Sequence, residues 1–240
     1  MEKQRLDVTM AGLGLVASRS QAESYVRLGQ VKVNGRAATK PGQLVLPSDT
    51  IQLTAETQYV SRAALKLKSA AEIFKLNFHG KTVLDVGSST GGFTQYALSQ
   101  GATKVIAVDV GTDQLHPTLR PDPRIELHEK TDIRDFTSRE AIQMVVGDVS
   151  FISLREILPH VATLVSAQTD IVAMVKPQFE AGQSSVKHKG VIKNDKMRRD
   201  ILKDFETWAV RYFKIIDKAD SGVAGSKGNV ERFYILRKLN

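Results

Sequence analysis

The chain has 240 residues, 42% of them hydrophobic, and a formal net charge of +8 with a sequence pI near 9.6. It contains no cysteine, which excludes disulfides, thiolate metal sites and cysteine nucleophiles, and its five scattered histidines lack zinc-like spacing. With no membrane-length apolar run and no secretory segment, we expect a cytoplasmic protein with no metal, no membrane partner and a polyanionic partner such as nucleic acid.

The first 56 residues are expected to form a separate small α+β domain. A short helix follows Arg5, and a second helix is expected to start at an N-cap Ser18 and to end at Gly29. The Asn34-Gly35 pair then lies between extended runs, which is a strong hairpin signal. The sequence therefore predicts two helices followed by a small antiparallel sheet.

Residues 57–60 are expected to be a short linker, and residues 61–240 a second, larger domain. An amphipathic helix capped by Ser61 opens that domain, and Lys66 lies beside its buried stripe. A lysine in such a position ordinarily lays its apolar stem along the surface and keeps its ammonium group in water.

The stretch from Lys81 to Asp109 combines a strand, a glycine turn and a helix. A short β-branched run, 82–86, predicts a buried parallel strand, and the turn that follows at Gly87 consists of small residues. Such a turn brings the backbone close to a ligand at a helix N-terminus. The next strand ends in Asp109, where a carboxylate can accept hydrogen bonds from a ribose diol.

The glycine spacing matches neither a dinucleotide fingerprint nor a triphosphate-binding loop. Asp85, at the end of the first strand, would repel a phosphate but suits a cationic ligand such as S-adenosylmethionine, whose amino group needs a carboxylate. A purely structural glycine turn in some other α/β domain stays open as the alternative.

Strands alternate with helices through the rest of the chain, which predicts a mainly parallel sheet with helices on both faces. Further strands are expected at 124–128, 143–148, 170–176, 213–216 and 232–236, and helices at 154–165 and 197–213. Ligands bind such sheets at the carboxyl ends of the strands. The polar residues expected at that rim are Asp85, Asp109, Asp132, Asp148 and Lys176.

Asp132 falls where an adenine amino group would be held, whereas Asp148 and Lys176 end neighbouring strands in the other half of the site. An acid–lysine pair there indicates chemistry on a weakly acidic hydroxyl. Methyl transfer mainly requires alignment of two reactants, but a hydroxyl proton must still leave. An amine removes that proton only if burial or a second cation lowers its pKa, and Lys66 would supply such a cation.

Several motifs of the first domain resemble the small RNA-binding domain named after ribosomal protein S-four. They are Arg5-Leu-Asp, Ser18-Arg19, Val31-Lys-Val-Asn-Gly35 and Asp49-Thr-Ile51. In that family the second helix and the following turn lie against structured RNA, and phosphate contacts position the protein without reading bases. The resemblance implies RNA contacts by Arg5, Arg19, Arg27 and Lys32.

The second domain resembles the FtsJ-like ribose 2'-O-methyltransferases. Ser61-Arg62-Ala-Ala-Leu-Lys66, Asp148, Lys176-Pro177 and Glu231 match their Lys-Asp-Lys-Glu tetrad. Longer motifs, among them Asp85-Val-Gly-Ser-Ser-Thr-Gly-Gly-Phe-Thr94 and Gly228-Asn-Val-Glu231, resemble the TlyA type, which joins both domains. The resemblance covers essentially the whole chain. It implies a Rossmann-like methyltransferase domain, S-adenosyl-L-methionine as cofactor, and 2'-O-methylation of cytidine in ribosomal RNA or ribosomal subunits.

The same resemblance implies that Lys176 is the base or its electrostatic equivalent. Lys66, Asp148 and Glu231 would orient it and the 2'-hydroxyl. The cofactor site would be lined by Asp85, Gly87, Ser88, Gly91, Phe93, Asp109 and Asp132.

Two stretches depart from the family pattern. The pair Ala63-Ala64 replaces the usual Gly-Gly, which predicts a firmer helix and a stiffer hinge between the domains. Residues 113–123 hold three prolines, which predicts an altered flap near the cofactor.

Residues 177–182 are expected to form a loop over the acceptor pocket, and Lys187 and Lys189 would continue the RNA-contacting face.

Three competing functions stay open. Relatives labelled haemolysins suggest a membrane-active protein, against which the lack of a membrane-length apolar segment counts. A catalytically idle RNA-binding assembly factor could use the same fold. A methyltransferase for a small-molecule hydroxyl would leave the basic first domain unexplained.

Overall fold

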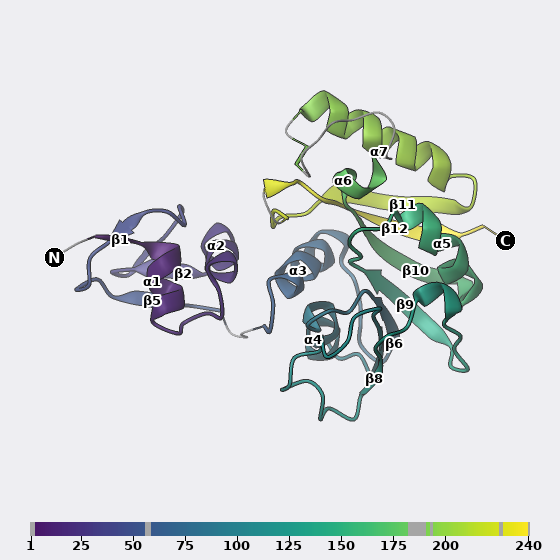
Figure 1. Cartoon of the computed structure of the whole chain (residues 1–240), viewed down its shortest axis with the longest axis horizontal. Helices are drawn as coiled ribbons and strands as arrows, with labels where there is room; N and C mark the ends of the chain where they lie inside the picture. The colour runs from purple at the N-terminus through teal and green to yellow at the C-terminus, as the bar shows by residue number, and fades with distance from the viewer. Residues whose placement is uncertain (1–2, 56–58, 182–190, 193, 226–227, 240) are drawn as a thin grey trace.

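The computed structural model describes residues 3–55, 59–181, 191–192, 194–225 and 228–239. They form a small N-terminal module, residues 3–55, and a larger C-terminal α/β domain (Figure 1). The predicted order, a small α+β unit followed by a Rossmann-like domain with a mainly parallel sheet, is confirmed.

The N-terminal module packs two helices on short antiparallel strands. Ser18 caps the second helix as predicted, because its side chain accepts from the N–H of Gln21. Asn34 and Gly35 both have positive φ, 50° and 76°, the geometry of a tight hairpin turn. The elements are β1 (Gln4–Arg5), α1 (Leu6–Gly12), α2 (Arg19–Arg27), β2 (Val31–Val33), β3 (Arg36–Ala37), β4 (Leu44–Val45) and β5 (Ile51–Leu53).

The strands of the module form two sheets where the sequence predicted one. The first has the order β3-β2-β5. The run around Leu44 does not join it, because β4 pairs instead with β1, a strand that the sequence did not indicate. Two-residue strands carry too little periodicity to be recognised from sequence.

The C-terminal domain is built on a seven-stranded sheet of order β11-β12-β10-β9-β6-β7-β8. The run from β10 to β8 is parallel, and β12 lies antiparallel between β11 and β10. The strands are β6 (Thr82–Val86), β7 (Lys104–Val108), β8 (Ile125–His128), β9 (Ile142–Gly147), β10 (Val165–Val175), β11 (Phe213–Asp220) and β12 (Arg232–Lys238). Because the chain turns to opposite sides from β6 and β9, the carboxyl ends of these two strands form a topological switch point, where such folds bind ligands.

Helices cover both faces of this sheet (Figure 1). They are α3 (Ala63–Phe74), α4 (Gly92–Ser99), α5 (Leu154–Thr163), the short α6 (Pro177–Glu180), α7 (Asp195–Ala209) and the 3-10 turn η1 (Ile133–Asp135). Alternate residues of β6 face different cores: Val83 packs with α3 and α4, and Leu84 with α5 and α7. Strands buried on both sides explain the continuous apolar runs in the sequence.

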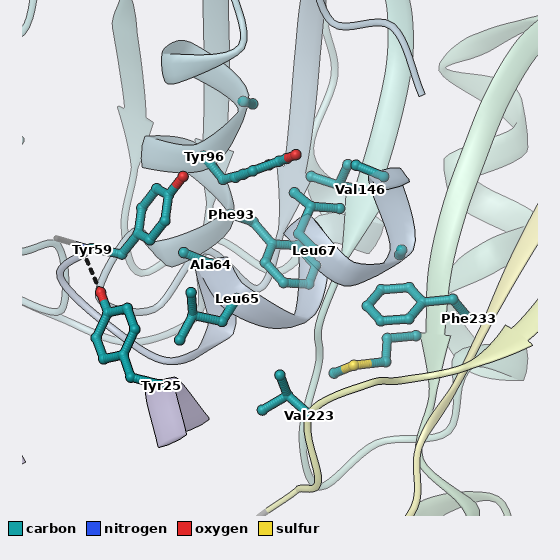
Figure 2. Close-up of a cluster of buried hydrophobic side chains, with 14 of the residues drawn as sticks. Tyr25, Tyr59, Ala64, Leu65, Leu67, Phe93, Tyr96, Val146, Val223 and Phe233 are labelled. Carbon is teal, nitrogen blue, oxygen red and sulfur yellow. Dashed lines mark hydrogen bonds between the residues drawn. The ribbon is translucent and has the colours of Figure 1, made fainter. Parts of the chain in front are cut away.

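Tyr59 joins the two parts of the chain (Figure 2). Its carbonyl accepts from the Gln21 amide at 2.6 Å and its N–H donates to the Tyr25 hydroxyl at 3.3 Å, so both contacts reach α2. Its ring lies 6.0 Å from that of Tyr96 on α4. The next N–H, of Val60, donates to the Gln95 side chain at 2.7 Å.

Three local predictions are wrong. Ser61 does not cap α3: the helix starts at Ala63 with a helical N-cap, Arg62, and no side-chain cap. Lys66, by contrast, is buried with 4% of its area exposed, so it differs from an ordinary lysine at the edge of an apolar stripe. The helix before β11 ends at Ala209, since Phe213 already lies buried in the strand.

The third wrong prediction concerns residues 177–182, expected to form a loop, which begin as the helical turn α6. Pro177 occupies its first position, where a missing N–H and a fixed φ are tolerated. Lys187 and Lys189 lie outside the described residues.

The contact between α3 and α4 leads to a prediction. A Cβ on Gly92 would lie 2.3 Å from Ser61 Oγ and 2.9 Å from the backbone nitrogen of Ala64. We expect Gly92→Ala to lower the free energy of unfolding by about 1–3 kcal/mol, the usual cost of overpacking. Gly12→Ala is the matched control, because nothing lies within 4 Å of its Cβ, and it should change stability by less than about 1 kcal/mol. Chemical unfolding followed by circular dichroism checks both, and equal midpoints would contradict the packing argument.

Candidate active site

Two adjoining pockets open at the carboxyl ends of the central strands. The first, here called the apolar pocket, has a volume of about 350 Å³ and is walled mainly by Val86, Val108, Val110, Ile133, Val149, Phe151, Ile152 and Ile157, with Asp109 and Asp132 at its rim. The second, here called the tetrad pocket, has a volume of about 270 Å³ and is lined by Ser61, Arg62, Ala63, Lys66, Ser88, Thr90, Phe93, Lys176 and Glu231. Both pockets share Gly87, Ser89, Asp148 and Ser150, so two ligands bound there would meet at Asp148.

Four charged side chains converge in the tetrad pocket. Lys66 Nζ lies 2.5 Å from Glu231 Oε2 and 4.0 Å from Asp148 Oδ2. Lys176 Nζ lies 2.6 Å from Asp148 Oδ1 and donates to Ser150 Oγ at 2.7 Å. The contact with Asp148 is an ion pair rather than an aligned hydrogen bond.

The fold explains why these four residues meet. Lys66 comes from the first turn of α3, while Asp148 and Lys176 directly follow β9 and β10, which are parallel neighbours. Glu231 precedes β12, and because β12 runs antiparallel to β10, its first residue lies beside the last residue of β10. A strand inserted in the opposite direction thus delivers its starting residue to the same rim.

The row Glu231–Lys66–Asp148–Lys176 alternates in sign. Its side chains are at most 14% exposed, so each charge has lost most of its water. Alternation gives every buried charge a counter-charge, which such burial requires. Lys176 also lies 5.9 Å from the centre of the Phe179 ring, a position in which the aromatic face attracts a cation.

The glycine turn after β6 is held by Asp109. One of its carboxylate oxygens accepts from the N–H of Ser89 and the other from that of Gly111, both at 2.7 Å. Gly87 has a φ of 80°, and a Cβ there would lie 3.0 Å from the carbonyl oxygen of Asp148. The turn therefore lies directly against the strand end that carries the tetrad acid.

Asp85 lies beneath this turn and lines neither pocket. It is fully buried, accepts from Thr94 Oγ1 at 2.6 Å through Oδ2, and has no partner for Oδ1 among the described residues. Burial, followed by the nearby carboxylate of Asp148, raises the pKa of Asp85 from 3.8 to about 7. Ser88 Oγ and Ser61 Oγ are likewise buried without a described partner.

The other expected cofactor residues divide between the pockets and their support. Asp132 lines the apolar pocket, and its hydrogen bonds from Arg134 lower its pKa to about 2, so it is a carboxylate at neutral pH. Phe93 lines the tetrad pocket and stacks 6.3 Å from Phe233. Gly91 lines neither pocket: it is the left-handed N-cap of α4, with Leu115 packed against it.

Sequence reasoning missed several residues at these pockets. Phe151 is 92% exposed at a φ of 66°, and Val110 is 70% exposed, and both border the apolar pocket. Ser150 accepts a hydrogen bond from Lys176, and Ser61 lies in the tetrad pocket, where its hydroxyl has no partner among the described residues. An aromatic residue in the polar stretch just after a strand-end acid was the available signal for Phe151.

The arginines expected to contact RNA mostly pair with acids of their own module. Arg5 and Arg19 both reach Asp7, at 2.8 and 3.5 Å, and Arg27 lies 2.7 Å from Glu23. All three stay at least half exposed. Lys32 lies exposed on β2, with no acid partner among the described residues.

Among the residues that the structure describes, no helix combines the length and apolar character needed to cross a membrane. The profile of the FtsJ-like methyltransferase family matches residues 59–238, and that of the S4 domain matches residues 4–51. The two matches correspond to the C-terminal domain and to the N-terminal module.

Individual relatives match almost the full chain. The 16S/23S rRNA (cytidine-2'-O)-methyltransferase TlyA of Mycobacterium tuberculosis is 39% identical over 98% of this chain and 90% of its own length. Hemolysin A of Brachyspira hyodysenteriae is 36% identical over 95% of this chain and 97% of its own. A solved Streptococcus thermophilus protein described as a candidate hemolysin superposes with a TM-score of 0.73 at 35% identity, over all of this chain and 90% of that one.

The buried state of Asp85 leads to a prediction about pH. Since the folded protein holds this proton more tightly than the unfolded chain does, the stabilisation is complete below pH 3.8 and is lost as pH rises through about 7. Over that window the free energy of unfolding should fall by up to about 1.4 kcal/mol per pH unit, relative to Asp85→Asn. Denaturant unfolding of both proteins at a series of pH values measures the difference. A difference that does not vary with pH would contradict the raised pKa.

Proposed function

We propose that this chain, which belongs to the FtsJ-like methyltransferase family, methylates the ribose 2'-hydroxyl of a cytidine in ribosomal RNA. Within that family it belongs to the TlyA type, which carries an N-terminal S4 domain. The methyl donor in this proposal is S-adenosyl-L-methionine. The observation that carries it is the buried row of two lysines and two carboxylates beside a glycine turn.

The residues around the turn fit this cofactor. When bound, it supplies a methyl group on a positively charged sulfur. Asp85 Oδ1 and Ser88 Oγ are buried polar atoms without a partner among the described residues, and the amino-acid portion of the cofactor would satisfy them. Asp109 would accept from a ribose diol, and Asp132, which is ionised at neutral pH, would accept from an adenine amino group. The apolar walls between them suit a flat base.

The tetrad pocket would then hold the acceptor ribose. In the transfer, the ribose oxygen forms a bond to the methyl carbon, the carbon–sulfur bond breaks and the hydroxyl proton leaves. Lys176, at the end of the charged row, would take that proton or stabilise the oxygen as it becomes negative. Asp148 and Ser150 hold its amine in place, and Lys66 with Glu231 completes the charge balance on the far side.

The N-terminal module would supply the affinity for RNA. Lys32 and Arg36 project from its hairpin with no acid partner among the described residues, whereas Arg5 of β1 and the two arginines of α2 are bridged to carboxylates. Phosphate contacts from such cations orient a protein on RNA without reading its sequence.

The first test is methyl transfer by a Lys176 variant. Transfer of labelled methyl to ribosomal subunits should fall by about 10²–10⁴-fold in Lys176→Ala, the usual contribution of a positioned proton acceptor. Lys203→Ala removes an exposed lysine of α7 and should transfer at the wild-type rate. Alkaline digestion locates the label, because a methylated 2'-oxygen protects the adjoining phosphodiester bond. Label on a base, or full transfer by Lys176→Ala, would overturn the assignment.

A further inference from the structure

A groove runs between the N-terminal module and the C-terminal domain, next to the tetrad pocket. Its volume is about 350 Å³. One wall is α2, and the other is the segment that leads towards Glu231. The lining residues are Ser20, Glu23, Ser24, Arg27, Arg62, Val223, Ala224, Gly225 and Gly228.

Arg62 connects this groove to the tetrad pocket. It is the one described residue that lines both. Its carbonyl accepts from the N–H groups of Leu65 and Lys66 in the first turn of α3, which fixes its backbone relative to Lys66. Its guanidinium makes no hydrogen bond or ion pair with any described residue, unlike Arg5, Arg19 and Arg27.

Most residues in the walls of the groove have small or polar side chains. Ser20 and Ser24 present hydroxyl-bearing turns of α2, and Gly225 and Gly228 face them without side chains. The groove's acid, Glu23, is bridged to Arg27 at 2.7 Å, so it does not cancel Arg62. A Cβ on Gly225 would lie 2.4 Å from Glu231 Oε1, so this wall lies directly against the tetrad.

We propose that this groove holds the RNA strand next to the acceptor nucleotide, and that Arg62 binds a phosphate flanking the acceptor ribose. The inference rests on the proposed function. A ribose placed in the tetrad pocket carries a phosphate on each side, and the RNA strand has to leave the pocket in both directions. Arg62 marks one exit, where it offers a cation without a partner among the described residues. Its planar guanidinium matches a phosphate through two parallel hydrogen bonds.

The lining favours a nucleic-acid strand over a protein segment. A helix or strand of a protein partner needs apolar anchors, whereas this groove offers mainly hydroxyls, glycines and charged side chains, and its valine, Val223, is buried. A phosphodiester backbone needs a narrow basic channel without base-specific groups. Because phosphate contacts position a strand rather than read it, Arg62 should affect alignment and affinity and leave the choice of base unchanged.

The test compares Arg62→Ala, Arg62→Lys and Arg139→Ala in methyl transfer to ribosomal subunits. Arg139 is the matched control, because it is exposed, unpaired among the described residues and placed before β9 at the opposite rim of the sheet. We expect Arg62→Ala to raise the KM for RNA by about 10–100-fold, the usual worth of a charged hydrogen bond. Arg62→Lys should recover part of this loss, and Arg139→Ala should match the wild type.

Salt dependence gives a second readout. Loss of one phosphate contact should reduce the slope of log affinity against log salt by about 0.7 in Arg62→Ala. The affinity for S-adenosyl-L-methionine, measured by calorimetry without RNA, should not change. If this affinity falls while the KM for RNA stays the same, Arg62 belongs to the cofactor site and the inference is overturned.

Ser20 tests the groove independently of Arg62, since it lies exposed on the opposite wall. Ser20→Glu places a negative charge in the proposed path and should weaken RNA binding, while Ser20→Ala should bind as the wild type does.

Different results would refute the proposed function and the proposed groove. A wild-type protein that transfers no methyl to RNA refutes the proposed function. A wild type that methylates RNA, with Arg62→Ala and Ser20→Glu both unchanged in KM and salt slope, refutes the groove alone.

Discussion

The burial of two ammonium groups at one rim of the sheet is the constraint on which the rest of the C-terminal domain depends. Lys66 and Lys176 have lost most of their water, and nearby carboxylates stabilise their charges instead. Asp148 lies between the two lysines and contacts both. Loss of Asp148 would leave Lys176 without a counter-charge, and loss of Glu231 would leave Lys66 with only the 4.0 Å contact to Asp148. The start of α3 and the ends of β9, β10 and β12 that meet at this rim therefore have to come together.

The antiparallel strand β12 places Glu231 at this rim, where it supplies the counter-charge of Lys66. Further contacts fix the segment that leads into it: the Ser69 side chain accepts from the N–H of Gly222, and the Asn229 side chain accepts from the N–H of Ile192. Asp220, at the end of β11, holds both Arg198 and Arg232. A carboxylate this firmly placed suits a reaction in which the protein mainly aligns two reactants.

The sequence predicted what is encoded locally. The central strands are short β-branched runs, and β6 was predicted with its actual bounds because Gly87 ends it. The helical pattern alone did not predict that Lys66 is buried, because its partner Glu231 lies 165 positions away and such a pattern cannot show a charge from another element. Only the resemblance to the family's tetrad grouped the two residues. Likewise, an acid at the end of β7 indicated a ligand, whereas Asp109 also holds two backbone N–H groups of the protein itself.

Residues 59–66 form one short segment that contacts the N-terminal module, the helix after the glycine turn, the interdomain groove and the tetrad. Tyr59 bonds α2 of the N-terminal module, Val60 bonds α4 behind the glycine turn, Arg62 enters the interdomain groove and Lys66 enters the charged row. The α-helix starts at Ala63, and alanine is more favourable in a helix than glycine by about 1 kcal/mol per residue. A helical start is therefore expected to carry the orientation of the module to Lys66, in keeping with the predicted stiffer hinge. In the proposed reaction the module would then contribute to alignment at the tetrad as well as to affinity, because RNA bound to it would be held by the segment that leads to the lysine.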